Sequence, residues 1–437
     1  MTSTSRLLRR YALTALLASS FCASSFCAPM QAEDLGWPQW RGPHRDGRAA
    51  PQELLDSWPE NGPQLLWQSN DGGFGFSTPT VKNDKLYTLG KIGDRVAAIC
   101  IDAKTGKKVW ETSFADGNAN DKYNTGWGDG PRGTPTIDGD RLYALSDLGI
   151  LACLDLQSGK IQWSVDFVKD FGGKIPTWGY SESVLIDGDK VIATPGGPNF
   201  LVGLDKETGK KVWESKSSHE AQYASIIKAD FEGIPTYVTA AKEGLIGTNA
   251  ITGEELFVNA KTGNQTAVIP TPIVSGNRIY HSSGYGAGNA AVEIKREGSK
   301  LIATEIYHNN RQSMENHHGG YILDNGTIYG FSRAMRGVWM AQDLATGDVL
   351  WNQKVGTSRS GSIAYADGKL ICYDDGEGIC YLAEASKDGW KSAGELKIPE
   401  TTTYDRKQGA IWSHPIVADG KLIIRDHEKL FAYNIAK

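Results

Sequence analysis

The stretch FLVGLDKETGKKVW, residues 200–213, contains the pattern that predicts the fold. An apolar run leads into Asp205, Gly209 closes a short polar turn, and Trp213 follows four residues beyond that glycine. Aspartate accepts hydrogen bonds from turn amides, and glycine adopts the positive φ that a bulged hairpin loop requires. The stretch therefore predicts two antiparallel strands joined by a tight turn, with a tryptophan on the second strand.

The same pattern occurs five times, at residues 97–110, 150–163, 200–213, 244–257 and 338–351. A large aromatic side chain at one fixed place on the second strand can fill the space between neighbouring sheets, so we expect a structural role for it. A similar outer-strand sequence around residues 62–70 adds a further tryptophan. The structural positions of the repeat are Trp67, Trp110, Trp163, Trp213, Phe257, Trp351, Gly106, Gly159, Gly209, Gly253 and Gly347.

A second hairpin precedes each of these pairs of strands. TPTIDGDRLYAL, from residue 134, is typical: a turn sequence of the Asp-Gly kind lies between two runs of alternating apolar residues, which is a strong hairpin signal. Eight units of four strands, spaced by about 45 to 50 residues, account for nearly the whole chain. The sequence predicts an all-β fold, a single eight-bladed β-propeller of four-stranded antiparallel blades.

The two ends of the repeat predict how the ring closes. The last unit, from residue 414, supplies three strands and stops, whereas GPQLLWQSN at residues 62–70 has no partner before the first full unit. We expect this N-terminal strand to complete the C-terminal blade. Residues 33–437 then form the propeller, with residues 33–61 as an N-terminal clasp segment. WPQWRGPHRDG, residues 37–47, is expected to fasten the seam between the first and last blades rather than to bind a ligand.

Residues 1–32 have the features of a cleaved export signal. Arg6, Arg9 and Arg10 precede an apolar run that ends in small residues near Ala32. No later apolar run has the roughly 18 residues that a membrane span needs. The formal net charge of −5 gives no reason to expect nucleic acid, whose phosphates require a basic surface. We expect an exported protein, periplasmic or extracellular, and a monomer, because a closed ring leaves few open sheet edges.

Four cysteines follow the predicted signal. Cys372 and Cys380 lie symmetrically about Gly376, which suggests a hairpin with facing thiols and a disulfide in an oxidising compartment. Cys100 and Cys153 occupy matching places in two repeats, either as buried apolar residues or as a bridge between repeats, and we favour the former. No cysteine or histidine cluster has zinc-site spacing, so no metal site is predicted.

Polar and aromatic residues are concentrated in the loops before each innermost strand and in the middle hairpin loops. In a propeller these loops converge on one mouth of the central channel, where we expect any ligand site. Guanidinium and imidazole groups beside aromatic rings suit a polar or anionic ligand with flat or sugar-like faces. The expected ligand-binding residues are Arg132, Trp178, Glu182, Tyr223, His317, His318, Arg336, Arg359, Trp412, His414 and Asp426, and the middle loops add Arg333, Asp374, Asp375, Glu377, Arg425 and His427 to the rim.

His317 and His318 are the most specific pair in this set. If they lie on a strand, adjacent side chains point to opposite faces, so we do not expect them to share one metal ion.

The repeat motif LxxLDxxTGKxxW resembles that of the pyrroloquinoline quinone (PQQ) propeller superfamily. This superfamily includes quinoprotein alcohol dehydrogenases and BamB-type outer-membrane assembly scaffolds. The segments WPQWRGPHRDG, GDGPRGTPT, ENHHGGYIL and IWSHPIVADGKLIIRD are similar to those of exported PQQ-like repeat proteins of the planctomycete type. The resemblance implies the propeller fold. Because the superfamily contains both enzymes and scaffolds, it leaves the function open.

Three functions follow from these observations. The favoured one is a non-catalytic exported propeller that binds an envelope protein or a small polar ligand at the channel rim. The second is a PQQ-dependent dehydrogenase that oxidises alcohols or sugars, with catalytic residues unknown. Many such enzymes have a pair of adjacent cysteines, and they bind calcium through oxygen ligands; this sequence has no Cys-Cys pair and few rim acids, which argues against PQQ with calcium. The third is a carbohydrate or polyanion binder.

Overall fold

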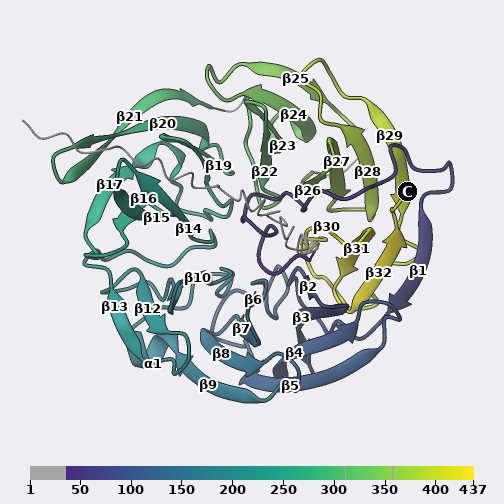
Figure 1. Ribbon diagram of the computed structural model, residues 1–437, viewed down its shortest axis with the longest axis horizontal. Coiled ribbons are helices and arrows are strands. Elements are labelled where there is room, and N and C mark those ends of the chain that lie inside the picture. The colour runs from purple at the N-terminus through teal and green to yellow at the C-terminus, as the bar shows by residue number, and fades with distance from the viewer. Residues whose placement is uncertain (1–35, 311, 357–358) are drawn as a thin grey trace, which may run out of the picture. The chain divides into compact units, whose positions relative to one another are not determined.

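Strand pairing organises the chain into eight four-stranded antiparallel sheets, which follow one another around a ring (Figure 1). The computed structural model describes residues 36–437 except 311, 357 and 358, so the predicted signal at residues 1–32 lies outside the described residues. In seven sheets the four strands are consecutive in sequence, and the first strand of each lies nearest the centre of the ring. The predicted eight-bladed β-propeller is confirmed.

The first four blades begin with β2, β6, β10 and β14, the innermost strand in each case. Their strands are β2 (Thr80–Lys82), β3 (Lys85–Ile92), β4 (Arg95–Asp102), β5 (Lys108–Asp116); β6 (Thr136–Asp138), β7 (Arg141–Leu145), β8 (Ile150–Asp155), β9 (Ile161–Asp166); β10 (Leu185–Asp187), β11 (Lys190–Ala193), β12 (Val202–Asp205), β13 (Lys211–Glu214); and β14 (Ile227–Phe231), β15 (Ile234–Ala241), β16 (Gly244–Asn249), β17 (Glu255–Asn259).

The last four blades begin with β18, β22, β26 and β30. Their strands are β18 (Ile273–Ser275), β19 (Arg278–Ser283), β20 (Gly288–Glu297), β21 (Lys300–Asn309); β22 (Tyr321–Asp324), β23 (Thr327–Ser332), β24 (Val338–Asp343), β25 (Val349–Gln353); β26 (Gly361–Ala366), β27 (Lys369–Asp374), β28 (Ile379–Glu384), β29 (Ser392–Lys397); and β30 (Ile416–Ala418), β31 (Lys421–Asp426), β32 (Lys429–Asn434), with β1 (Gln64–Ser69).

Helices are short in the described part of the chain: α1 (Phe167–Phe171), η1 (Ala260–Thr262) and η2 (Ala334–Arg336). Over residues 36–437, apart from the three omitted positions, we find no helix with the length and apolarity to cross a bilayer.

The repeat tryptophans join each blade to the next, as the sequence pattern predicts. The Trp67 indole donates to the carbonyl of Ala103, at 2.9 Å, and a Cβ added to Gly106 would lie 2.7 Å from the Trp67 ring. Trp163 repeats the arrangement against Gly209, where the same distance would be 2.6 Å. Because these turn glycines also have positive φ, any other residue there would be both strained and in collision with the neighbouring blade.

The ring closes where β1 pairs with β32, so an N-terminal strand completes the C-terminal blade as predicted. A second tie at this seam is the side chain of Arg425, on β31, which is fully buried. Its guanidinium donates to the carbonyls of Gly72 (2.8 Å), Gly73 (3.0 Å), Ser77 (2.5 Å) and Leu89 (2.9 Å), all in or before the first blade. A single side chain thus holds the last blade to the first.

Residues 37–49, which we call the axial plug, lie across the central channel. Trp37 pairs with Val81 of β2 through two backbone hydrogen bonds of 2.9 Å. Near the other end of the plug, the Ala49 amide donates to the carbonyl of Tyr365 in β26, at 2.8 Å. The plug therefore runs between the innermost strands of the first and seventh blades.

Two buried arginines hold the middle of the plug to opposite sides of the ring. Arg45 donates to the carbonyls of Ser183 (2.6 Å) and Val184 (3.1 Å), before the third blade, and Arg41 donates to the carbonyl of Tyr321 in the sixth. The expectation that this segment fastens the seam between the first and last blades holds for Trp37, which is buried in the apolar cluster shared by these two blades. The two buried arginines of the plug reach further than expected, because they donate to backbone carbonyls before the third blade and in the sixth.

The predicted disulfide between Cys372 and Cys380 is not formed: both thiols are free and buried. Cys372 is paired with Tyr381, and Cys380 with Tyr373, so the two cysteines point to opposite faces of the sheet. The symmetry about Gly376 predicts that Cys372 pairs with Cys380, but the observed register is shifted by one residue. Cys100 and Cys153 are also free and buried, as favoured.

Candidate ligand-binding site

A cavity of about 620 Å³ opens at one mouth of the central channel, lined by loops from all eight blades and by Trp40 of the axial plug. Most of the predicted rim residues meet there, because the loops before the innermost strands converge as expected. The predicted residues that line the cavity are Arg132, Trp178, Tyr223, His317, His318, Arg359, Trp412 and His414.

Aromatic rings form much of the cavity wall. The ring centroids of Phe76 and Trp412 are 5.0 Å apart, and Trp412 is stacked on Trp127 at 6.4 Å. Trp127 keeps 40% of its surface exposed. Trp178 and Tyr223 also line the cavity, and their ring centroids are 5.9 Å apart. Such a wall offers flat apolar faces to a ligand.

Arg132 is held against this wall. Its guanidinium carbon is 4.5 Å from the Phe76 centroid, within cation–π range. The Nε atom donates to the carbonyl of Trp178 and Nη2 to that of Gly128, both at 2.9 Å. Burial lowers the pKa of Arg132, but an arginine stays protonated at neutral pH. Among the described residues Nη1 has no hydrogen-bond partner and remains available to a ligand.

Two further arginines and one carboxylate complete the charged lining. Arg333 and Arg359 are exposed, and the Arg333 guanidinium carbon is 5.9 Å from the ring centroid of Tyr285. Asp375 is half-buried, and burial raises its pKa to about 6. Although the chain as a whole is acidic, the charged side chains that line this cavity are mainly positive.

Two histidines lie side by side in the loop that precedes β22. His317 Nδ1 is 3.4 Å from His318 Nδ1, so the expectation that the two rings point apart is wrong; the pair lies in a loop, not on a strand. His317 Nε2 is 3.0 Å from the Tyr285 hydroxyl, and His318 Nδ1 is 3.1 Å from Ser360 Oγ. Burial lowers the pKa of His318 to about 3, so the ring is neutral at neutral pH.

No group of three or more histidine, cysteine, aspartate or glutamate side chains within the described residues could hold a metal ion. The histidine pair therefore lacks the further ligands that a protein metal site needs.

The axial plug reaches the cavity through Trp40. Its indole donates to Thr271 Oγ1 at 2.9 Å and packs edge-on against His414, with ring centroids 4.6 Å apart. His414 Nε2 is 3.2 Å from the carbonyl oxygen of His318. Burial lowers the pKa of His414 well below its ordinary value. Plug and rim are thus joined where the cavity meets the channel.

Glu182 does not line the cavity, contrary to the prediction. Its neighbour Ser181 does, and Glu182 points into the protein instead, where Oε1 accepts the Thr194 amide at 2.6 Å. Burial raises the pKa of Glu182 to about 7, while the nearby charge of Arg45 lowers it. The two residues belong to the packing between plug and blades.

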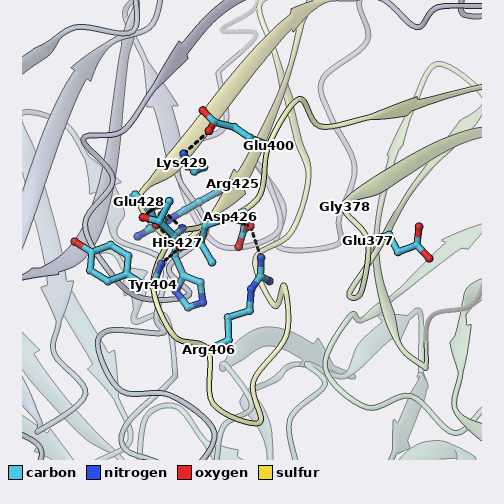
Figure 2. Close-up of polar contacts among 12 residues, drawn as sticks. Glu377, Gly378, Glu400, Tyr404, Arg406, Arg425, Asp426, His427, Glu428 and Lys429 are labelled. Atoms are coloured by element: carbon cyan, nitrogen blue, oxygen red, sulfur yellow. Dashed lines mark hydrogen bonds and ion pairs between the residues drawn. The ribbon is translucent and has the colours of Figure 1, made fainter.

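Asp426 is also buried away from the cavity. It accepts the Thr402 amide at 2.8 Å. It also forms an ion pair with Arg406, as Figure 2 shows. The neighbouring His427 is stacked on Phe74, with centroids 4.4 Å apart. These contacts tie Asp426 to the loop that carries Trp412.

Arg336 is exposed but outside the cavity lining, although it lies on the same hairpin loop as Arg333. The short η2 helix, in which Met335 and Arg336 have positive φ, lies between Arg333, which lines the cavity, and the next strand.

Four aromatic residues that line the cavity were not among the predicted ones. Phe76 lies in the loop before β2, the first innermost strand, so the convergence of these loops could have identified it. Trp127 lies in the long loop that also carries Arg132. Tyr285 is the tip of a glycine-rich hairpin. Trp40 had no local signal, because only long-range contacts bring the plug to this place.

Comparisons with known proteins agree with this architecture. A family model described as outer membrane protein assembly factor BamB matches residues 59–166 and 98–353. The protein of that name from Moranella endobia (strain PCIT) is 24% identical over 319 residues, which cover 67% of this chain and 72% of the relative.

Two solved structures show the same fold. BamB from Moraxella catarrhalis has a TM-score of 0.55 at 14% identity and covers 79% of this chain and 96% of its own. The quinohemoprotein alcohol dehydrogenase ADHIIG from Pseudomonas putida HK5 has a TM-score of 0.62 at 13% identity, covering 92% of this chain and 80% of its own. Identity this low shows the fold alone, whereas the match of the family model over more than half of the sequence shows the family. The chain belongs to the BamB family of PQQ-repeat β-propellers.

Proposed function

We propose that this protein is a non-catalytic binding protein of the cell envelope, and that the cavity at the channel mouth takes a small polar ligand. One observation carries the proposal: a cavity of about 620 Å³ is lined by aromatic rings and by three arginines that form no ion pair with a described carboxylate. Its volume lies within the range of about 300–1,000 Å³ that is typical of small-molecule sites. The Moranella relative is named as an outer-membrane assembly factor, which supports an envelope location.

The residues present do not fit PQQ with calcium. Calcium in proteins takes roughly six to eight oxygen ligands, most of them from carboxylates and carbonyls. The charged lining of this cavity contains one carboxylate, Asp375, beside Arg132, Arg333 and Arg359, and those positive charges oppose a divalent cation. This donor set favours binding over quinone-dependent oxidation.

Thermal unfolding of the full chain with a panel of neutral, acidic and amino monosaccharides tests the proposal. A ligand at about a hundredfold excess over its Kd stabilises the folded state by about 2.7 kcal/mol, so we expect at least one compound to raise the Tm. The Trp127→Ala variant should lose that increase, because it removes part of the aromatic wall. Tyr404→Ala is the matched control, since Tyr404 is a similarly exposed aromatic residue outside the cavity lining.

Two outcomes would contradict this function. The first is a ligand that stabilises Trp127→Ala as much as the wild type, which would place binding elsewhere. The second is oxidation of an alcohol or sugar, followed by dye reduction, after incubation with PQQ and calcium chloride.

A further inference from the structure

We propose that the ligand of this cavity is an acidic sugar, a saccharide unit whose carboxylate lies among Arg132, Arg333 and Arg359 and whose ring packs on the aromatic wall. The inference rests on the proposed function and names the class of ligand for the same site.

Charge is the first argument. The chain has a formal net charge of −5, yet three arginines and one aspartate line the cavity. The three lining histidines add no charge at neutral pH, because burial lowers the pKa of each. A ligand that enters this site therefore meets an excess of positive charge, which an anion would neutralise.

Free hydrogen-bond donors are the second argument. In the described residues, the arginines that form ion pairs are Arg48, Arg141 and Arg406, none of which lines the cavity. Within the part of the chain that the structure describes, Arg132 keeps Nη1 free after two of its donors bind carbonyls, and the exposed side chain of Arg359 has no hydrogen bond or ion pair. Guanidinium groups with free donors match the two oxygens of a carboxylate.

The aromatic wall and the neutral polar groups give the third argument. Trp127 and Trp412 are stacked with their planes 30° apart, which offers an extended face for the C–H groups of a sugar ring. Hydroxyl or amide side chains also line the cavity; they belong to Thr78, Ser181, Ser225, Thr266, Ser360 and Gln408. Such groups can bind the hydroxyls of a saccharide, and an aromatic acid would leave them unpaired.

The axial plug determines the direction of entry. Because it crosses the channel between β2 and β26 and contributes Trp40 to the cavity, a ligand would enter from the open mouth. The site would therefore take a single sugar unit or the end of a chain.

Isothermal titration of the full chain with D-galacturonate, D-galactose and benzoate tests the inference. We expect galacturonate to bind at least about tenfold more tightly than either of the others, since charge-assisted hydrogen bonds separate it from galactose and hydroxyl contacts separate it from benzoate. The double variant Arg333→Gln/Arg359→Gln should weaken galacturonate binding by roughly tenfold.

The matched control is the double variant Arg336→Gln/Lys354→Gln. It removes two positive charges from neighbouring exposed residues that do not line the cavity, so galacturonate affinity should change by less than about twofold. An equal loss in both double variants would mean that only the general charge of this face matters, and would overturn the inference.

Other results separate this inference from the proposed function. If galactose binds as tightly as galacturonate and Trp127→Ala weakens both, the cavity binds sugars but the acidic class is wrong. If benzoate binds most tightly, the ligand is an acid without hydroxyls. If none of the three compounds binds, the acidic-sugar inference is overturned. The thermal unfolding experiment with the monosaccharide panel then tests separately whether the cavity binds a ligand.

Discussion

The arginines of this protein form two groups that look alike in sequence and differ in what their donors contact. Arg41, Arg45 and Arg425 are buried, and their guanidinium groups donate to backbone carbonyls of several blades. Arg333 and Arg359 lie at the cavity mouth with no carboxylate partner among the described residues. The first group joins blades of the ring, although Arg41 Nη1 and Arg45 Nε are buried without a partner among the described residues. The second group is the one that we propose binds the ligand, and burial against backbone carbonyls of the blades distinguishes the first group from it.

Among the variants considered, we expect Arg425→Met to cause the largest loss of stability. Replacing it with methionine leaves five carbonyls without their donor at the seam of the ring, and each buried unpaired group costs about 1–3 kcal/mol. We expect the free energy of unfolding in urea to fall by more than about 4 kcal/mol. A loss below about 1 kcal/mol would show that water or a local shift replaces the guanidinium. Arg336→Met is the exposed control.

The stability of the protein should depend on pH through Glu182, a buried carboxyl near Arg45 of the first group. Burial raises its pKa from 4.5 to about 7 in the folded protein, so the folded state binds more protons than the unfolded chain between these values. The free energy of unfolding should therefore fall as pH rises from about 4.5 to about 7, by up to about 3 kcal/mol from this group.

Glu182→Gln should flatten that part of the stability curve, measured by urea unfolding at pH 5 and pH 7.5. Glu60→Gln, a change at an exposed acid, should leave the slope as it is in the wild type. An unchanged slope in Glu182→Gln would mean that the carboxyl is solvated or fully paired with Arg45.

Arg359 should show the smallest effect on stability. Because its side chain is exposed and makes no hydrogen bond or ion pair with another described residue, Arg359→Gln should change the free energy of unfolding by less than about 0.5 kcal/mol. Calorimetric unfolding would measure this. A loss of 2 kcal/mol or more, on the order of a buried polar contact, would move Arg359 into the structural group.

The fold could be predicted because its signals are local and repeated. The turn from Asp205 to Gly209 specifies one hairpin by its own chemistry, and five copies of it specify a ring. Convergence of the loops followed from that topology, which is why Arg132, His317 and Trp412 were expected together. The conformation of each single loop does not affect this convergence.

The errors occurred where one residue of register or a long-range contact decides the outcome. Glu182 follows Ser181 in an extended loop, so the two side chains point in opposite directions. Cys372 and Cys380 are out of register by a single position. The path of the plug depends on contacts such as that between Arg41 and Tyr321, 280 residues apart, for which the sequence has no local signal.

The way the ring closes has a consequence for the biosynthesis of the protein. The plug and β1 are made first, but β1 pairs with β32, which is made last, and Arg425 contacts Gly72 across 353 residues of sequence. Until the final blade has been synthesised, β1 keeps an unpaired edge and the channel cannot be enclosed. The early blades can form hairpins as they emerge, whereas the closed ring, and with it the complete cavity, can exist only after β32 has been made.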